Sequence, residues 1–412
     1  MRAIFKTTLQ AFAVAALLGT GVASADDELP TLTIGYLDLV DDIRYDEWGI
    51  HPVDIRSATA IADRRAYSGA ALGLEELKSL KRITKTHFAM ERVSGTGSAA
   101  LIAAVERMVA TGSRYFLIDA PDDVVAEVAA GTRDLGIALF NTTATGDSLR
   151  SELCQPHLFH TAASRTMLTD ALSQYLVARK WHEVLVLQGP LPQDKETVAA
   201  FERSSVLFGL EIIAIRDFVL GNDPRAREMN DLDFLTGGLG SDYDFLSSGD
   251  DYDVVFVADT DGEFALGVPY ATQEPAPVVG ASGLVPRIWH WSYMRHGAPQ
   301  VHGRFERKFG RRMGESDWGA WVAMKTIGNA IARTKTTDVA TVTDALRGGK
   351  FKVDGSKGPG MSFRPWNNQL RQPILLTREN WTVARAPLEG FKNRTNKLDS
   401  LGIAARGSLC NF

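Results

Sequence analysis

The feature that most constrains the fold is an alternation of short apolar runs with helical patterns. In the first part of the chain, the strand-like runs lie at 32–37, 86–91, 115–118 and 136–140, and the helical patterns at 57–80, 98–110 and 122–130. Strands separated by helices of roughly 10–20 residues form βαβ units, in which the strands are parallel. We therefore predict a parallel α/β sheet that is covered on both faces.

The same alternation starts again in the second part of the chain. Its strand-like runs lie at 184–187, 211–215, 254–257 and 278–280, its helical patterns at 166–178, 196–208, 301–309, 318–331 and 339–346, and a last strand-like piece at 374–376. The stretch 221–253 is rich in Gly, Asp and Ser and is predicted to be a loop. Pro275-Ala276-Pro277 marks the point at which we expect the chain to cross from the second lobe back to the first. We predict lobe 1 over 26–150 plus 277–350, and lobe 2 over 151–276 plus 351–412.

The N-terminus has the three parts of a secretory signal. Arg2 and Lys6 are followed by an apolar run at 11–18, and Ala23-Ser24-Ala25 forms a small-residue cleavage site before Asp26. We predict that residues 1–25 are a signal peptide, cleaved after Ala25, and that the protein is periplasmic. An uncleaved N-terminal anchor is the alternative.

Composition argues against several classes of protein. The 45 basic and 50 acidic side chains give a net charge of −5, whereas a nucleic-acid binder would be strongly basic on one face. The sequence contains no H-E-x-x-H and no G-x-S-x-G motif. We expect no nucleic-acid partner, no cofactor and no enzymatic activity.

The two cysteines, Cys154 and Cys410, are too few for a four-cysteine zinc site. In an oxidising compartment a lone pair is more often joined than free. We expect a Cys154–Cys410 disulfide, and two buried free thiols are the alternative.

Three polar motifs have both a structural and a functional interpretation. The Gly-rich stretch 94–100 fits a dinucleotide-binding turn or a helix cap in which Ser94 or Ser98 bonds free N–H groups, and we favour the cap. The acidic stretches 242–253 and 259–263 lack the full spacing of a calcium loop, so we predict solvated loops, with a cation site as the alternative. His157 and His160 flank a strand on opposite faces, which argues against a shared metal.

Aromatic clusters also allow two interpretations. Trp289-His290-Trp291 follows a strand, and Asp317 precedes Trp318 and Trp321, which share one helix face. Asp317 is placed as an anion at a helix N-terminus. The tryptophans either pack the lobe interiors or line a cleft for a planar ligand. In the second case, Arg364 or Arg371 would bind the ligand's carboxylate.

Six longer sequence segments carry a family resemblance that covers almost the whole chain. The segments lie at 154–161, 284–291, 297–300, 317–321, 362–373 and 398–402. The chain resembles the type I periplasmic solute-binding proteins of the branched-chain amino-acid ABC transporter class. More narrowly, it resembles the substrate-binding proteins associated with pyrroloquinoline-quinone (PQQ)-dependent alcohol dehydrogenase systems. The resemblance implies a two-lobed fold with a parallel sheet in each lobe and a hinged cleft.

The resemblance also implies a set of ligand-binding residues. These are Asp119, Thr143, Ala144, Thr145 and Ser282. We also expect Asp259, Glu263 and Trp289 in the cleft. Asp119 stands where the family usually has a small hydroxyl residue, and an acid there would repel a ligand carboxylate. Ser282 stands where the family has the acid that holds a ligand ammonium. We therefore expect a ligand other than leucine or valine.

The resemblance implies capture of a small solute for an ABC permease in the inner membrane, with membrane contact only through that permease. It also implies a link to PQQ-dependent alcohol oxidation. A sensor or accessory subunit that presents its lobes to a kinase ectodomain or a dehydrogenase is the alternative. A third hypothesis is a periplasmic enzyme or metal carrier built on the Asp-rich loops.

Overall fold

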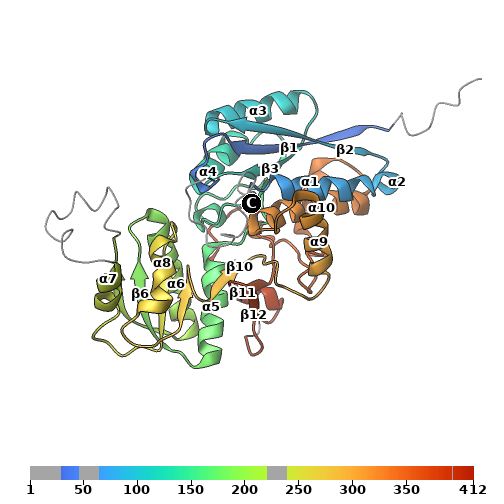
Figure 1. Cartoon of the computed structure of the whole chain (residues 1–412). Coiled ribbons are helices and arrows are strands. Elements are labelled where there is room, and N and C mark those ends of the chain that lie inside the picture. Colours follow the sequence, from blue (N-terminus) through green and yellow to red (C-terminus); the bar gives the residue numbers. More distant parts are fainter. Residues whose placement is uncertain (1–28, 46–64, 220–238, 392) are drawn as a thin grey trace, which may run out of the picture.

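The protein folds into two α/β lobes, each built on its own parallel sheet (Figure 1). The computed structural model describes residues 29–45, 65–219, 239–391 and 393–412. The predicted signal peptide lies outside these residues, as do the first part of the predicted 57–80 helix and part of the 221–253 stretch. Within the described residues, no helix is both long and apolar enough to cross a bilayer.

Lobe 1 contains a five-stranded sheet in the order β2-β1-β3-β4-β5. Its strands are β1 (Thr31–Leu39), β2 (His87–Gly95), β3 (Tyr115–Asp119), β4 (Ala138–Asn141) and β5 (Leu158–His160). All neighbouring strands are parallel. Successive residues of β3 alternate between two hydrophobic layers, Tyr115 and Leu117 in one and Phe116 and Ile118 in the other. This alternation follows from the two-residue period of a strand.

Helices cover both faces of this sheet. They are α1 (Tyr67–Lys78), α2 (Lys81–Thr84), α3 (Ser98–Ala110), α4 (Asp122–Gly131), α9 (Ala298–Phe309), α10 (Glu315–Thr334) and α11 (Val339–Arg347). In Figure 1, α3 lies on one side of β1 and β2, and α1 and α10 lie on the other. The helices α1 and α10 pack closely at Gly69, where a Cβ atom would lie 1.9 Å from the Asp317 carbonyl oxygen. Only glycine fits this contact.

Lobe 2 contains a four-stranded parallel sheet in the order β7-β6-β8-β9. Its elements are β6 (Glu183–Gln188), β7 (Glu211–Asp217), β8 (Val254–Ala258), β9 (Val278–Gly280), α5 (Arg165–Arg179), α6 (Pro192–Phe208), α7 (Leu239–Leu246) and α8 (Glu263–Ala271). The prediction of a loop over 221–253 is wrong at α7, where Tyr243 packs into the lobe 2 core. This apolar anchor stabilises a helix in a locally polar sequence.

A small antiparallel sheet completes the fold. It consists of β10 (Val285–Arg287), β11 (Ile374–Arg378) and β12 (Trp381–Ala386), and Figure 1 shows it beside α5. Four 3-10 turns are present in the described chain, η1 (Ile43–Tyr45), η3 (Ser148–Arg150), η6 (Lys397–Ser400) and η7 (Ala405–Gly407). The sequence indicated a strand at 374–376 but not this sheet.

The sheet pairings move the predicted lobe boundaries. β5 pairs with β4 of lobe 1, although residue 151 was the predicted start of lobe 2. β9 pairs with β8 of lobe 2, although residue 277 was the predicted return to lobe 1. The boundaries at 150/151 and 276/277 were therefore placed one strand too early, because the chain completes a last strand in one sheet before it crosses.

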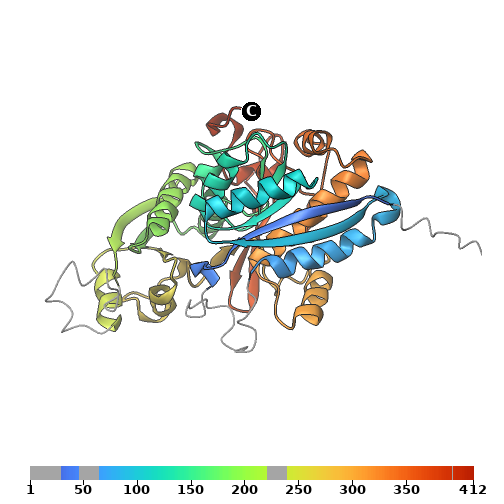
Figure 2. The same cartoon turned by 90° about the horizontal axis from the view of Figure 1, so that it is seen from above.

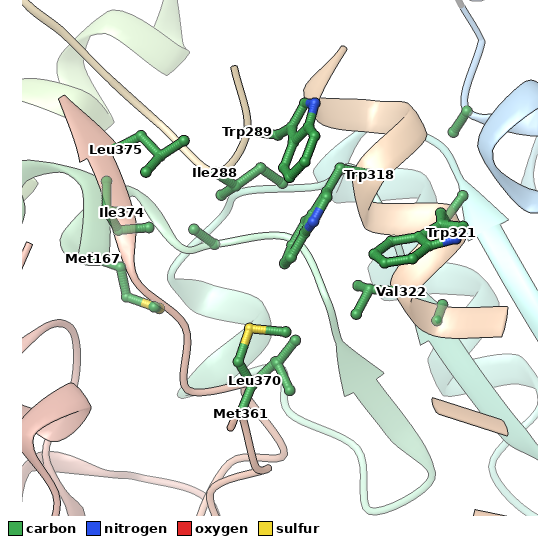
Figure 3. Close-up of a cluster of buried hydrophobic side chains, with 14 of the residues drawn as sticks. Met167, Ile288, Trp289, Trp318, Trp321, Val322, Met361, Leu370, Ile374 and Leu375 are labelled. Carbon is green, nitrogen blue, oxygen red and sulfur yellow. The ribbon is translucent and has the colours of Figure 1, made fainter. Parts of the chain in front are cut away.

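An aromatic core lies where these elements meet (Figure 3). Trp289, Trp318 and Trp321 are buried, and the ring centroids of Trp289 and Trp318 lie 6.3 Å apart at an interplanar angle of 14°. The Lys357 ammonium lies 3.8 Å from the Trp318 ring centroid. Met167 and Ile374 of other elements face the same cluster in Figure 3. The interpretation of these tryptophans as packing residues is confirmed.

Two arginines predicted as possible ligand contacts hold the C-terminal segment instead. The Nε atoms of Arg364 and Arg371 donate to Asp399 at 3.0 and 2.8 Å. Asp317 is in its predicted place, because its carboxylate accepts from the Gly314 N–H at 2.8 Å at the start of α10.

A disulfide joins Cys154, which precedes β5, to Cys410 near the C-terminus. Their Cα atoms lie 5.9 Å apart across a sequence separation of 256 residues. The bond therefore ties the end of the chain to lobe 1.

Candidate functional site

A buried polar cluster lies at the carboxyl ends of β1, β3 and β4. Asp119 is the last residue of β3, and its side chain is fully buried. Its carboxylate accepts hydrogen bonds from the Tyr36 hydroxyl at 3.0 Å and the Tyr45 hydroxyl at 2.8 Å. It also accepts from Arg44 Nη2 at 3.0 Å and Thr143 Oγ1 at 2.9 Å. We call these five residues the Asp119 cluster.

The turn after β1 positions the cation of this cluster. Asp42 accepts from the Arg44 backbone N–H at 3.1 Å and from its Nε at 2.9 Å, which fixes the η1 turn. Burial opposes the charge of Arg44, but the hydrogen bond to Asp42 and the nearby charges hold its pKa above the ordinary value. Burial and the Asp119 charge raise the pKa of Tyr36 and Tyr45 well above the ordinary value. Both tyrosines therefore remain hydrogen-bond donors.

A second ion-pair group lies beside the first on β1. Asp38 accepts from Arg92 Nη2 at 2.6 Å and from the Ser94 hydroxyl at 2.5 Å, and Arg65 Nη1 lies 3.3 Å away. The Asp38 side chain is 1% exposed, whereas those of Arg92 and Arg65 are 33% and 20% exposed. Arg44 is 29% exposed above fully buried Asp119. At this end of the sheet, solvent therefore meets guanidinium groups, with the carboxylates beneath them.

The structure brings only part of the predicted lobe 1 set together. Thr143 and Asp119 share the cluster, but Ala144 donates its N–H to Asn141 Oδ1 at 2.8 Å. The Thr145 carbonyl accepts from the Arg165 N–H at 2.9 Å, at the start of α5. The predicted repulsion between Asp119 and a ligand carboxylate is not supported, because the Asp119 charge is buried and paired with Arg44.

The predicted lobe 2 residues lie apart from this cluster. Asp259 accepts from the Ala265 N–H at 2.8 Å, which holds the first turn of α8, and burial raises its pKa. Glu263 is the exposed first residue of α8, and Ser282 is half-buried in the turn after β9. Among the described residues, no hydrogen bond or ion pair joins these three side chains to the Asp119 cluster.

The assignment of Trp289 to the ligand cleft is wrong. Its side chain is 1% exposed and stacks against Trp318 in the core. An aromatic side chain contributes most to stability when it is buried in this way. The local sequence does not show whether a tryptophan packs in the core or stacks on a ligand.

Sequence reasoning missed four members of the site: Tyr36, Asp42, Arg44 and Tyr45. A usable signal was present, because Asp42, Arg44 and Tyr45 directly follow the first strand. Ligand sites of open α/β sheets lie outside the carboxyl ends of the strands.

The Gly-rich motif also differs from its predicted role. Helix α3 begins after Gly97 without a side-chain cap. Ser94 donates to Asp38, and Ser98 donates to Glu127 on α4. The prediction that one of these serines caps α3 is therefore wrong. Among the residues that the structure describes, no three acidic, His or Cys side chains come together as a metal site.

His157, just before β5, and His160, the last residue of β5, have separate partners. His157 Nε2 lies 3.2 Å from Thr132 Oγ1, and His160 Nδ1 lies 3.1 Å from Asn141 Nδ2. Burial, with Arg133 and Arg347 nearby, lowers the pKa of His157 from 6.5 to about 4.

This shift predicts an acid-sensitive fold. As pH falls below 6.5, the unfolded chain binds a proton at His157, whereas the folded protein binds it only near pH 4, so stability decreases across this interval. We expect His157→Gln to reduce the loss of unfolding free energy between about pH 7 and pH 5 by about 1–2 kcal/mol. Urea unfolding at several pH values measures this. His182→Gln, which changes an exposed histidine, serves as control, and identical pH profiles for wild type and His157→Gln would contradict the prediction.

Comparison with known proteins places the fold. No family model matches the sequence, and no curated protein matches it. The structure is similar to an amino acid ABC transporter substrate-binding protein from Pseudomonas fluorescens Pf-5, at a TM-score of 0.66 and 14% identity over 93% of this chain and 99% of that one.

Two further solved structures contain ligands. A branched-chain amino acid transporter substrate-binding protein from Streptococcus pneumoniae, in complex with isoleucine, gives a TM-score of 0.62 and 16% identity over 86% of this chain and 98% of that one. A solute-binding protein of an ABC transporter from Rhodopseudomonas palustris BisB5, in complex with 3,4-dihydroxybenzoic acid, gives a TM-score of 0.62 and 13% identity over 84% of this chain and 93% of that one. The chain has the two-lobed α/β fold of ABC transporter substrate-binding proteins.

Proposed function

We propose that this protein is the periplasmic substrate-binding component of an ABC transporter and captures a small solute between its lobes. The fold supports this proposal, as does the placement of charged side chains at the strand ends of lobe 1. In such a protein the lobes close on the solute, and the greater affinity of the closed state supplies the energy for closure. The predicted export signal, cleaved after Ala25, agrees with this role.

We propose further that the solute carries a carboxylate. The observation that carries this proposal is Arg44, whose guanidinium lies partly exposed above buried Asp42 and Asp119. Arg44 Nε and Nη2 already donate to Asp42, and Nη1 donates to Thr143 Oγ1 at 3.1 Å, so a solute carboxylate would bind at the Nη1 edge in exchange for such a partner. The two ligands named above, isoleucine and 3,4-dihydroxybenzoic acid, are both carboxylic acids.

Calorimetric titration with aliphatic amino acids, aromatic acids and short dicarboxylates tests the proposal, after mass spectrometry has identified any solute that co-purifies. We expect a carboxylic acid to bind and Arg44→Met to weaken its binding at least about tenfold, because a charge-assisted hydrogen bond contributes about 1.5–3 kcal/mol. The amide of the same acid should bind more weakly than the acid.

Arg333→Met is the matched control, because Arg333 is an exposed arginine of lobe 1 that donates to the Lys350 carbonyl. The Arg333→Met variant should bind the carboxylic acid with the affinity of the wild type. Equal binding of the acid and its amide would contradict a carboxylate site. Tight binding of leucine would contradict the expectation that the ligand differs from leucine and valine.

The link to PQQ-dependent alcohol oxidation remains a proposal that rests on the sequence resemblance. Neighbouring genes separate this role from the alternative. Permease and ATPase genes support transport, whereas a sensor kinase or dehydrogenase gene without them supports a sensor or accessory subunit.

A further inference from the structure

A basic surface lies at the end of lobe 1 opposite the Asp119 cluster. Helix α2 ends just before His87, the first residue of β2, whereas Asp119 is the last residue of β3. Because β2 and β3 run parallel in the same sheet, these two residues lie at its opposite ends. Figure 1 shows α2 at the end of β1 and β2 that points away from lobe 2. The surface is therefore remote from the proposed solute site.

Helix α9 extends this surface. Arg304 of α9 donates to Glu76 at 2.6 Å, and Lys308 pairs with Glu75 on the neighbouring helix α1. We call the combined surface the basic face. It comprises Lys78, Lys81, Arg82, Lys85, Arg304, Arg307 and Lys308.

The basic face carries excess positive charge. Lys78, Arg82, Lys85 and Arg307 are exposed and form no ion pair with the residues that the structure describes. The seven cations of the basic face outnumber the acids of α1 and α9, which are Glu75, Glu76 and Glu306, so this region is positive although the whole chain has a net charge of −5. Such a concentration of charge creates a local positive potential that attracts anions.

The shape of the face suits small anionic groups. One shallow depression of about 460 Å³ is lined by Arg304 and Arg307 with Pro299 and Gln300 of the same helix. A second, of about 270 Å³, is lined by Lys78, Lys81, His87 and Phe88. Guanidinium and ammonium groups at such depressions bind phosphate oxygens well.

We propose that the basic face docks on an anionic phospholipid surface. The cores of protein–protein interfaces are depleted of lysine and enriched in aromatic residues, whereas this face is lysine-rich. Ile83, 62% exposed, is the large apolar side chain that it presents, between Arg82 and Lys85. A polybasic segment with an apolar side chain is typical of contact with lipid headgroups. This contact is direct, unlike the permease-only membrane contact that the sequence resemblance implied.

Co-sedimentation of the exported protein with vesicles tests the proposal. We expect binding to vesicles that contain about 30 mol % phosphatidylglycerol and none to pure phosphatidylcholine vesicles. The triple variant Lys78→Gln, Arg82→Gln, Lys85→Gln should bind about a hundredfold more weakly, because each surface cation adds about fivefold to affinity. High salt should abolish the binding.

A matched triple variant provides the control. Lys180, Lys195 and Arg406 are exposed cations outside the basic face, and Lys180→Gln, Lys195→Gln, Arg406→Gln removes the same charge. Lys85 and Lys180 each lie directly after the last residue of a helix, and their own φ angles are positive, 54° and 62°. The backbone contexts of these two lysines therefore also match. The control should bind vesicles as the wild type does, and both variants should keep the wild-type Tm.

Three outcomes overturn the proposal. The wild type could bind neutral and anionic vesicles equally, or the basic-face variant could bind like the control. A soluble acidic peptide could bind tightly to the wild type while anionic vesicles do not, which would assign the face to an acidic protein. None of these outcomes affects the solute site, because the variants lie at the other end of lobe 1.

Discussion

Replacing both cysteines, Cys154→Ser with Cys410→Ser, is expected to lower the free energy of unfolding by about 5 kcal/mol. The disulfide closes a loop across a sequence separation of 256 residues, so it removes a large number of conformations from the unfolded chain. The expected loss is a large fraction of the stability of an ordinary domain. Urea unfolding of the wild type and the double variant measures the loss. The variant should also show a larger m-value, because its unfolded chain exposes more surface.

Reduction provides an independent test of the same bond. Dithiothreitol should lower the unfolding midpoint of the wild type toward that of the double variant, and it should not change the variant. Equal midpoints for the oxidised wild type and the variant would contradict a stabilising bridge. Two reactive thiols in the unreduced, denatured protein would show that the bridge had not formed.

The long periodic elements could be predicted from the sequence. Helix α3 occupies the predicted 98–110, and α5 and β6 extend the predicted segments by one residue at each end. The small antiparallel sheet could not be predicted, because β10 pairs with β11 across about ninety residues, Val285 opposite Thr377. The edge strand β10 and the central strand β11 have only three and five residues, and local sequence does not specify such distant pairings.

The site was predictable only in outline. Asp119 and Thr143, which the family resemblance implied as site residues, lie together where the neighbouring strands β3 and β4 end. The charge balance there was not predictable, because Arg44 reaches Asp119 from a turn that follows a different strand. An isolated acid in the sequence shows its charge but not its partner.

The basic face illustrates the same limit at the surface. Lys78 and Arg307 come from parts of the chain more than two hundred residues apart, and the ion pair between Arg304 and Glu76 joins these parts. The near-neutral total of 45 basic and 50 acidic side chains conceals this local excess. Composition therefore limits the class of protein but does not show how its surface charge is distributed.

Asp119→Ala is expected to destabilise the protein by about 3–5 kcal/mol. The substitution leaves the buried Tyr36 hydroxyl and the half-buried Tyr45 hydroxyl without their shared acceptor, and it removes one of the two carboxylates that neutralise Arg44. Each buried donor that loses its acceptor, the Tyr36 hydroxyl and the Ala66 N–H, costs about 1–3 kcal/mol, and Arg44 keeps Asp42 but loses part of its compensation. Thermal and urea unfolding measure the change. Asp123→Ala removes an exposed acid from the nearby first turn of α4 and should change stability by less than about 0.5 kcal/mol.

A double-mutant cycle separates the ion pair from the rest of the Asp119 cluster. If the Arg44–Asp119 contact carries the stabilisation, Arg44→Met should cost much less in the Asp119→Ala background than in the wild type, with a coupling energy of about 2 kcal/mol. Tyr36→Phe removes one neutral donor and should cost about 1 kcal/mol. Additive effects of Arg44→Met and Asp119→Ala would contradict the pairing. In that case the cluster could not neutralise Asp119 as proposed, and the acid would again oppose a carboxylate ligand at this end of the sheet.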